Sequence, residues 1–161
     1  MNFGVETRLT IMMDKTLRAM TQADLDVIWN IERRVHAYPW TLGNFHDALV
    51  STNICLVYED GGQMMGYAVM MLAVDEVQLL NISIDAPYQR QGLGMRLLRE
   101  LQTQMRGLKM QRMLLEVRST NIAARGLYEA AGFVKIGLRR GYYAGTQGRE
   151  DAMVMECLLL I

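Results

Sequence analysis

Residues 84–94 read Ile84-Asp85-Ala86-Pro87-Tyr88-Gln89-Arg90-Gln91-Gly92-Leu93-Gly94. They follow an apolar, strand-like run, and beyond them leucines recur at the spacing of a helix. Consecutive backbone N–H groups at such a strand–helix junction bind anions, and the helix dipole strengthens the attraction. Glycine at 92 and 94 lets the backbone approach a ligand without an intervening side chain. The stretch therefore predicts a phosphate-binding loop between a strand and a helix.

Two common kinds of phosphate-binding loop do not fit this stretch. A P-loop requires Gly-Lys-Ser/Thr, and Met95-Arg96 stands there instead. A dinucleotide fingerprint requires a third glycine where Leu97 stands, and an acidic residue about 20 positions on, where Lys109 to Met113 stand. A nicotinamide dehydrogenase is therefore disfavoured. Taken alone, the stretch also fits a glycine-rich turn that binds nothing.

Hydrophobic periodicity on both sides predicts the element order β-α-α-β-β-β-α-β-α-β-β. Helices are expected from Leu25 to the break at Tyr38-Pro39, and over 41–50, 94–105 and 121–131. Strands are expected over 15–20, 54–59, 66–74, 77–84, 113–117, 134–138 and 152–159, the last two linked by a Tyr- and Gly-rich segment from Arg139 to Gly148. Because the crossover through residues 84–113 requires parallel neighbours, the fold class is α/β with a mixed sheet.

Composition narrows the class of protein. A chain of 161 residues predicts one domain, here 14–161, preceded by an N-terminal extension over 1–13. Equal numbers of basic and acidic residues, 17 each, argue against a nucleic-acid partner. No run approaches the roughly 20 apolar residues that cross a bilayer, and no secretory signal is recognisable, so no membrane partner and a cytoplasmic location are expected. The sequence does not indicate an oligomeric state.

The few thiols and imidazoles predict no metal site. Cys55 and Cys157 lie in strand-like apolar runs and are interpreted as buried structural thiols. His36 and His46 have no Cys, His or carboxylate cluster at metal-ligand spacing.

A second motif lies downstream: Asn121-x-x-Ala124-x-x-Leu127-Tyr128-Glu129-x-x-Gly132-Phe133. Together with Gln89-x-x-Gly92-x-Gly94, it resembles the motifs of the GCN5-related N-acetyltransferase (GNAT) superfamily. The resemblance implies a central mixed sheet with two splayed strands, flanked by helices, and acetyl-CoA as cosubstrate.

The resemblance also implies which residues bind the coenzyme. The backbone of Ile82, Ser83 and Ile84 would bind the pantetheine arm between the splayed strands, and an N–H there would polarise the thioester carbonyl. Asn121 would contact the coenzyme, and it equally suits a helix N-cap. The pyrophosphate would lie on the loop formed by Arg90, Gln91, Gly92, Leu93, Gly94 and Met95.

Acetylation of an amine requires a base for the ammonium proton and an acid for the departing thiolate. Glu116 is the candidate base because it interrupts the apolar strand 113–117, where a carboxylate is costly unless it is paired or functional. An ion pair with Arg118 is the structural alternative. Tyr128 is the candidate acid, because it lies on the same face of its helix as Asn121. The alternative is that the Tyr128 ring packs against the sheet and its hydroxyl hydrogen-bonds to the backbone.

Within the superfamily, the chain resembles the RimI branch, the bacterial ribosomal-protein alanine N-acetyltransferases. Matching stretches include 36–40, 115–118 and 150–152, while Ser83 and Gln91 depart from the residues common there. The implied substrate is the N-terminal alanine of small-subunit ribosomal protein eighteen. Tyr142-Tyr143 and the Tyr38–Trp40 turn are the candidate walls of the peptide groove, and core or loop packing of these aromatic residues is the alternative. Acetylation of other protein N-termini or of a small amine, and a non-catalytic coenzyme-binding sensor, remain alternatives.

Overall fold

The structure is a computed structural model that describes residues 15–160. The expected extension over 1–13 lies outside these residues, and the domain boundary at 14 stays a prediction. Contacts group the chain into two compact units, which we call unit 1 (15–69 with 81–91) and unit 2 (70–80 with 92–160). None of the helices in the described part of the chain is long and apolar enough to cross a membrane.

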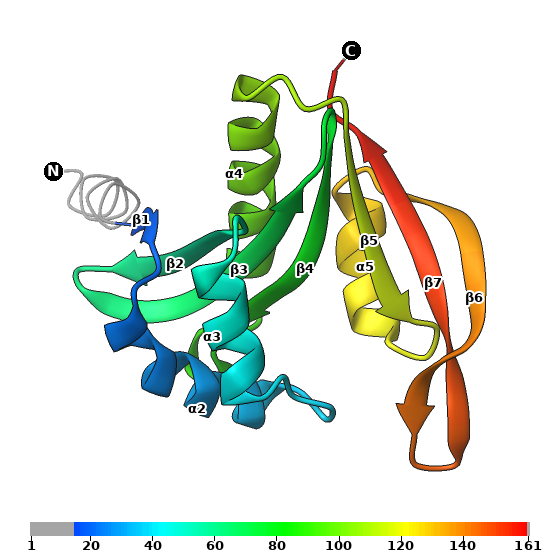
Figure 1. Cartoon of the computed structure of the whole chain (residues 1–161), viewed down its shortest axis with the longest axis horizontal. Helices are drawn as coiled ribbons and strands as arrows, with labels where there is room; N and C mark the ends of the chain where they lie inside the picture. The colour runs from blue at the N-terminus through cyan, green and yellow to red at the C-terminus, as the bar shows by residue number, and fades with distance from the viewer. Residues whose placement is uncertain (1–14, 161) are drawn as a thin grey trace, which may run out of the picture. The chain divides into compact units, whose positions relative to one another are not determined.

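The strands form one seven-stranded sheet in the order β1-β2-β3-β4-β5-β7-β6, and β3 and β4 run through both units (Figure 1). The strands are β1 Lys15–Ala19, β2 Ile54–Asp60, β3 Gln63–Leu72, β4 Glu76–Ile84, β5 Arg112–Arg118, β6 Val134–Gly145 and β7 Gly148–Leu158. The helices are α2 Leu25–Val35, α3 Leu42–Val50, α4 Leu93–Gly107 and α5 Ile122–Ala130, with short 3-10 turns at Gln22–Asp24 and Ala86–Tyr88. The predicted order is confirmed, and the parallel pairing of β4 with β5 confirms a mixed sheet.

Unit 1 packs α2 and α3 side by side, and each begins at a capped turn (Figure 1). The Asp24 carboxylate accepts from the Thr21 N–H at 2.8 Å, as part of a capping box. Thr41 and Asn44 cap α3 reciprocally, at 2.9 and 3.1 Å. These caps direct the apolar face of each helix inward, so that Ile28 and Phe45 are fully buried.

Between β2 and β3, Gly61 and Gly62 both have positive φ, 55° and 82°, as a two-residue hairpin turn requires. In unit 2 the apolar faces of α4 and β5 are buried through Leu97, Leu101 and Met113. Cys55 and Cys157 are buried and free, as expected.

The strand β3 passes very close to the end of β4 at Gly66. A Cβ at this position would lie 2.2 Å from the Ser83 carbonyl oxygen and 2.9 Å from the Ile84 side chain. Because the first of these atoms is backbone, the clash cannot be relieved by rotating a side chain.

We therefore expect Gly66→Ala to lower the free energy of unfolding by about 3 kcal/mol or more. Urea unfolding measures the change. The control is Gly126→Ala in α5, where an added Cβ meets nothing within 4 Å and helix propensity predicts a gain of up to about 1 kcal/mol. Equal stabilities of the two variants would contradict the close approach.

The expected link from Arg139 to Gly148 is wrong: β6 continues to Gly145 and β7 begins at Gly148. Tyr143 pairs with Glu150, and Gly145 with Gly148, so the segment is the end of a long hairpin. The register shifts between Arg139 and Tyr143, where Gly141 has a φ of 58°. A bulge of this kind accommodates a glycine within a paired strand. In the sequence alone, the same glycine-rich segment resembles a loop.

Candidate active site

The loop after β4 is braced by its own side chains, all in unit 1. Asp85 accepts from the Ala86 N–H at 2.8 Å and pairs with Arg34 at 3.0 Å. The Gln89 side chain donates to the Ile84 carbonyl at 2.9 Å, and the Gln91 side chain to the Pro87 carbonyl at 3.3 Å. Gln91 therefore stabilises the loop through its side chain, a role that the sequence did not indicate.

The backbone turns sharply where the loop meets α4. Arg90 and Gly92 have φ values of 61° and 77°, and Gly92 is the N-cap of the helix. The first N–H groups of a helix lack intrahelical acceptors, and no side chain in the described chain caps this one. A Cβ at Gly92 would meet nothing within 4 Å, so the backbone here is open to a ligand. These residues fit an anionic group such as a diphosphate.

The ladder between β4 and β5 joins Glu76–Leu79 to Arg112–Leu115. The rest of β4, from Asn81 to Ile84, belongs to unit 1. Ser83 is buried there, and its hydroxyl donates to the Asn81 side-chain oxygen at 2.8 Å. The Ser83 side chain is thus occupied within unit 1, which leaves its backbone as the part expected to bind pantetheine.

Glu116 lies on β5 opposite Val154 of β7, with 14% of its side chain exposed. Its carboxylate pairs with the Arg139 Nε at 3.3 Å. Arg118, the partner considered from the sequence, forms an ion pair with Glu150 at 3.1 Å. Arg139 was missed as a site residue because it was expected in a loop; in the structure β6 places it beside β7 at Ala152.

Tyr128 lies on α5 with its ring 5.7 Å from that of Phe133. Burial raises the pKa of its phenol to about 12, so the hydroxyl carries its proton at neutral pH. Asn121 directly precedes α5, and its side chain accepts from the Ala124 N–H at 3.2 Å; the N-cap interpretation is confirmed.

Within unit 2, Tyr143 interacts electrostatically with both candidate catalytic residues. Burial, and then the charge of Glu116, raise the pKa of Tyr143 to about 12. Tyr143 in turn is a minor electrostatic cause of the raised pKa of Tyr128. Tyr143 therefore interacts electrostatically with both Glu116 and Tyr128.

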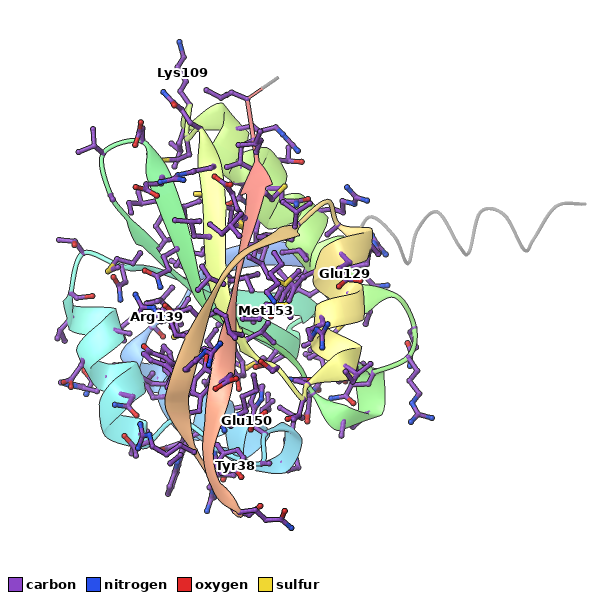
Figure 2. The ribbon with its side chains drawn as sticks, turned by 90° about the vertical axis from the view of Figure 1, so that its right-hand side faces the viewer. Tyr38, Lys109, Glu129, Arg139, Glu150 and Met153 are labelled. Carbon is purple, nitrogen blue, oxygen red and sulfur yellow. The ribbon has the colours of Figure 1, made fainter. Side chains whose placement is uncertain are left out.

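The adjacent rings of Tyr142 and Tyr143 on β6 lie between two arginine side chains, Arg139 of β6 and Arg118 of β5. The Arg118 guanidinium lies 4.4 Å from the Tyr143 ring centre, and that of Arg139 lies 5.1 Å from the Tyr142 ring centre. The two tyrosine rings meet edge to face at 5.0 Å. Glu150 accepts from the Thr120 N–H at 3.2 Å, which ties the hairpin to the start of α5. Figure 2 shows Arg139 and Glu150 on the two strands of this hairpin.

This arrangement in unit 2 can perform proton transfer: a carboxylate held by one arginine, and a protonated phenol on a neighbouring helix. No group of His, Cys, Asp and Glu within residues 15–160 is arranged to hold a metal ion.

Comparisons with known proteins identify the family to which the chain is similar. The model of the acetyltransferase (GNAT) family matches residues 15–133. The chain is 38% identical over 140 residues to the [ribosomal protein bS18]-alanine N-acetyltransferase of Escherichia coli K12, covering 87% of this chain and 95% of that protein. The protein of the same name from Haemophilus influenzae is 36% identical over 137 residues, covering 84% and 93%.

A solved structure agrees with the sequence comparison. The crystal structure of the ribosomal-protein-S18-alanine N-acetyltransferase from Escherichia coli superposes with a TM-score of 0.85 at 36% identity, covering 91% of this chain and 95% of that one.

Proposed function

The chain belongs to the acetyltransferase (GNAT) family, and from this premise we propose that it acetylates the N-terminal alanine of small-subunit ribosomal protein eighteen, with acetyl-CoA as donor. The observation that carries the proposal is the likeness to bS18-alanine N-acetyltransferases over 87% of the chain. A ribosomal substrate also supports a cytoplasmic location.

In the proposed reaction Glu116 accepts, through a water, the proton that the substrate ammonium loses. An α-amine has a pKa of about 8, so this deprotonation is only modestly uphill at neutral pH. The neutral nitrogen attacks the thioester carbonyl carbon, the C–N bond forms as the C–S bond breaks, and the nitrogen loses its second proton to solvent, as Glu116 later does with the first. Arg139 holds one carboxylate oxygen of Glu116, which leaves the other to face the water.

Tyr128 donates its hydroxyl proton to the departing sulfur, and solvent then restores that proton. The products are the acetylated N-terminus, the free thiol and one proton released to solvent. Coenzyme binding is assigned to the backbone of Ile82, Ser83 and Ile84, to the loop from Arg90 to Met95, and to Asn121. The open N–H groups at the start of α4 support this assignment for the pyrophosphate.

The test compares three acceptors with the purified chain: a peptide with the N-terminal sequence of the ribosomal protein, a peptide with only a lysine amine, and a free polyamine. We expect acetylation of the first, detected by mass spectrometry at the α-amine. Preference for the polyamine would favour a small-molecule acetyltransferase. Calorimetric binding of coenzyme A without turnover of any amine would favour a sensor.

Tyr142 is the candidate wall of the peptide groove, because 44% of it is exposed while Arg139 and Tyr143 hold its ring. We expect Tyr142→Ala to raise the KM for peptide by about tenfold, roughly the contribution of one aromatic contact. The KM for acetyl-CoA should stay the same. Val134→Ala, also exposed and on β6, is the matched control. An unchanged peptide KM would remove Tyr142 from the groove.

A further inference from the structure

Unit 1 contains a cluster of buried polar side chains that the proposed chemistry does not use. Glu32, Asn81 and Ser83 are 2%, 8% and 5% exposed. They come from α2 and from the end of β4, and they connect to Tyr67 on β3 and His36 after α2. A buried carboxylate is costly unless it is well hydrogen-bonded, so the cluster calls for a physical explanation.

Glu32 is the common acceptor of this cluster. Its Oε2 accepts from the Tyr67 hydroxyl. Both of its oxygens lie 3.2 Å from the Asn81 Nδ2. The backbone N–H of Trp40 donates to its Oε1 at 3.1 Å. One side chain thus contacts β3, β4 and the turn between α2 and α3.

The directions of the remaining hydrogen bonds follow from the donors available. Ser83 donates its only hydroxyl hydrogen to the Asn81 Oδ1, which has none to give. The His36 Nε2, 2.6 Å from the Ser83 oxygen, must therefore be the donor of that bond. The bonds run inward from His36 through Ser83 and Asn81 to Glu32, so an acceptor-only carboxylate completes the network.

Two of the three elements that Glu32 contacts, the end of β4 and the turn, are held by different further interactions. The end of β4 is also held by backbone, since the Asp85 N–H donates to the Met65 carbonyl of β3 at 2.8 Å. The turn is anchored by the bond from the Trp40 N–H to Glu32 and by a ring contact of 5.1 Å between Trp40 and Phe45. Loss of the carboxylate should therefore release the turn and leave β4 in place.

We propose that Glu32 is a positioning residue for the peptide substrate: it holds the Tyr38–Trp40 turn against the end of β4. The inference rests on the proposed function and on the expectation from the sequence that this turn forms one wall of the peptide groove. It assigns control of peptide affinity to a buried carboxylate that the proposed proton transfers do not use.

The first test is Glu32→Gln, which keeps the shape but replaces one of the two accepting oxygens by an NH2 group, so that the side chain no longer accepts from Trp40, Asn81 and Tyr67 together. We expect the KM for peptide to rise by about tenfold, equivalent to about 1.4 kcal/mol. The kcat and the KM for acetyl-CoA should stay within about twofold, because an interaction removed equally from ground and transition states changes KM alone. Asp26→Asn, on the exposed face of the same helix, is the matched control and should change none of the three constants.

Exchanging the carboxylate and the amide between positions 32 and 81 distinguishes a positioning role of Glu32 from a general loss of stability. Asn81→Asp alone places two carboxylates together and should also raise the peptide KM by about tenfold. The double variant Glu32→Gln with Asn81→Asp restores complementary donors and acceptors, since the new amide at position 32 can donate to the new carboxylate at position 81. Its peptide KM should return to within about twofold of the parent, as expected for coupled neighbours.

Each outcome decides one of the two proposals. If the parent does not acetylate the alanine peptide, the proposed function fails. If the parent is active and Glu32→Gln keeps its peptide KM, or lowers kcat instead, the positioning role fails. Should Glu32→Gln not fold, the double variant still decides: a folded double variant with a peptide KM raised tenfold or more overturns the proposal.

Discussion

Replacing Glu116 with Gln is expected to lower kcat by about a hundredfold or more at neutral pH. The amide keeps the volume of the side chain and an oxygen that accepts from Arg139, but it cannot take the ammonium proton. Acetyl-CoA binding, measured by calorimetry, should be unchanged, because the coenzyme is assigned to other residues. The measurement is steady-state release of free thiol with the alanine peptide as acceptor.

The pH dependence makes this prediction specific for a base. Below about pH 8 the α-amine is charged and needs Glu116, whereas above that pH it is increasingly neutral without help. The difference in kcat between the parent and Glu116→Gln should therefore become smaller as the pH rises from 7 to about 9.5. The control is Glu156→Gln on β7, which removes a carboxylate paired with Arg112 at 3.0 Å. A Glu116→Gln enzyme with parental kcat at pH 7 would refute the assignment.

Replacing Tyr128 with Phe is expected to lower kcat by about a hundredfold, again without loss of acetyl-CoA affinity. The ring and its contact with Phe133 remain, so the variant removes only the proton donor. Without that donor the sulfur leaves as a thiolate, whose thiol has a pKa of about 8.5. The hydroxyl should stay protonated up to about pH 11, because burial raises the pKa of Tyr128 to about 12.

Single-turnover measurement separates the chemical step from binding and product release. The deficit of Tyr128→Phe should appear in that step. Tyr58→Phe, which deletes a hydroxyl from a buried residue of β2 in unit 1, is the control. Undiminished single-turnover rates in Tyr128→Phe would leave the departing sulfur without an assigned acid among residues 15–160.

The element order was predictable because its signals are local. Turn residues such as Gly61-Gly62 and capping pairs such as Thr41 with Asn44 act within a few positions, and the structure contains both the turn and the cap. Hydrophobic periodicity is equally local and placed each helix and strand within a few residues, apart from the β6–β7 hairpin. There, pairing across a bulge at Gly141 overrides the loop character of the glycines.

Some residues of the candidate site were likewise predictable from the sequence, and others were not. Glu116 and Tyr128 stand out because a carboxylate within an apolar strand and a tyrosine within a family motif are visible along the chain. Arg139 does not, because its distance to Glu116 depends on the register of β6 with β7 and of β7 with β5. Ser83 was expected to act through its backbone, and its bonds to Asn81 and His36 join partners two and 47 positions away.

The amino-acid sequence alone determined the order of the elements, the glycine-containing loop between β4 and α4, and the family, since each depends on residues close together along the chain. Tertiary structure alone decided the partners of the charged and polar groups: Arg139 for Glu116, and Tyr67, Asn81 and Trp40 for Glu32. The physical reason is that hydrogen bonds and ion pairs act over a few ångströms, and only strand register and helix packing bring distant residues within that range.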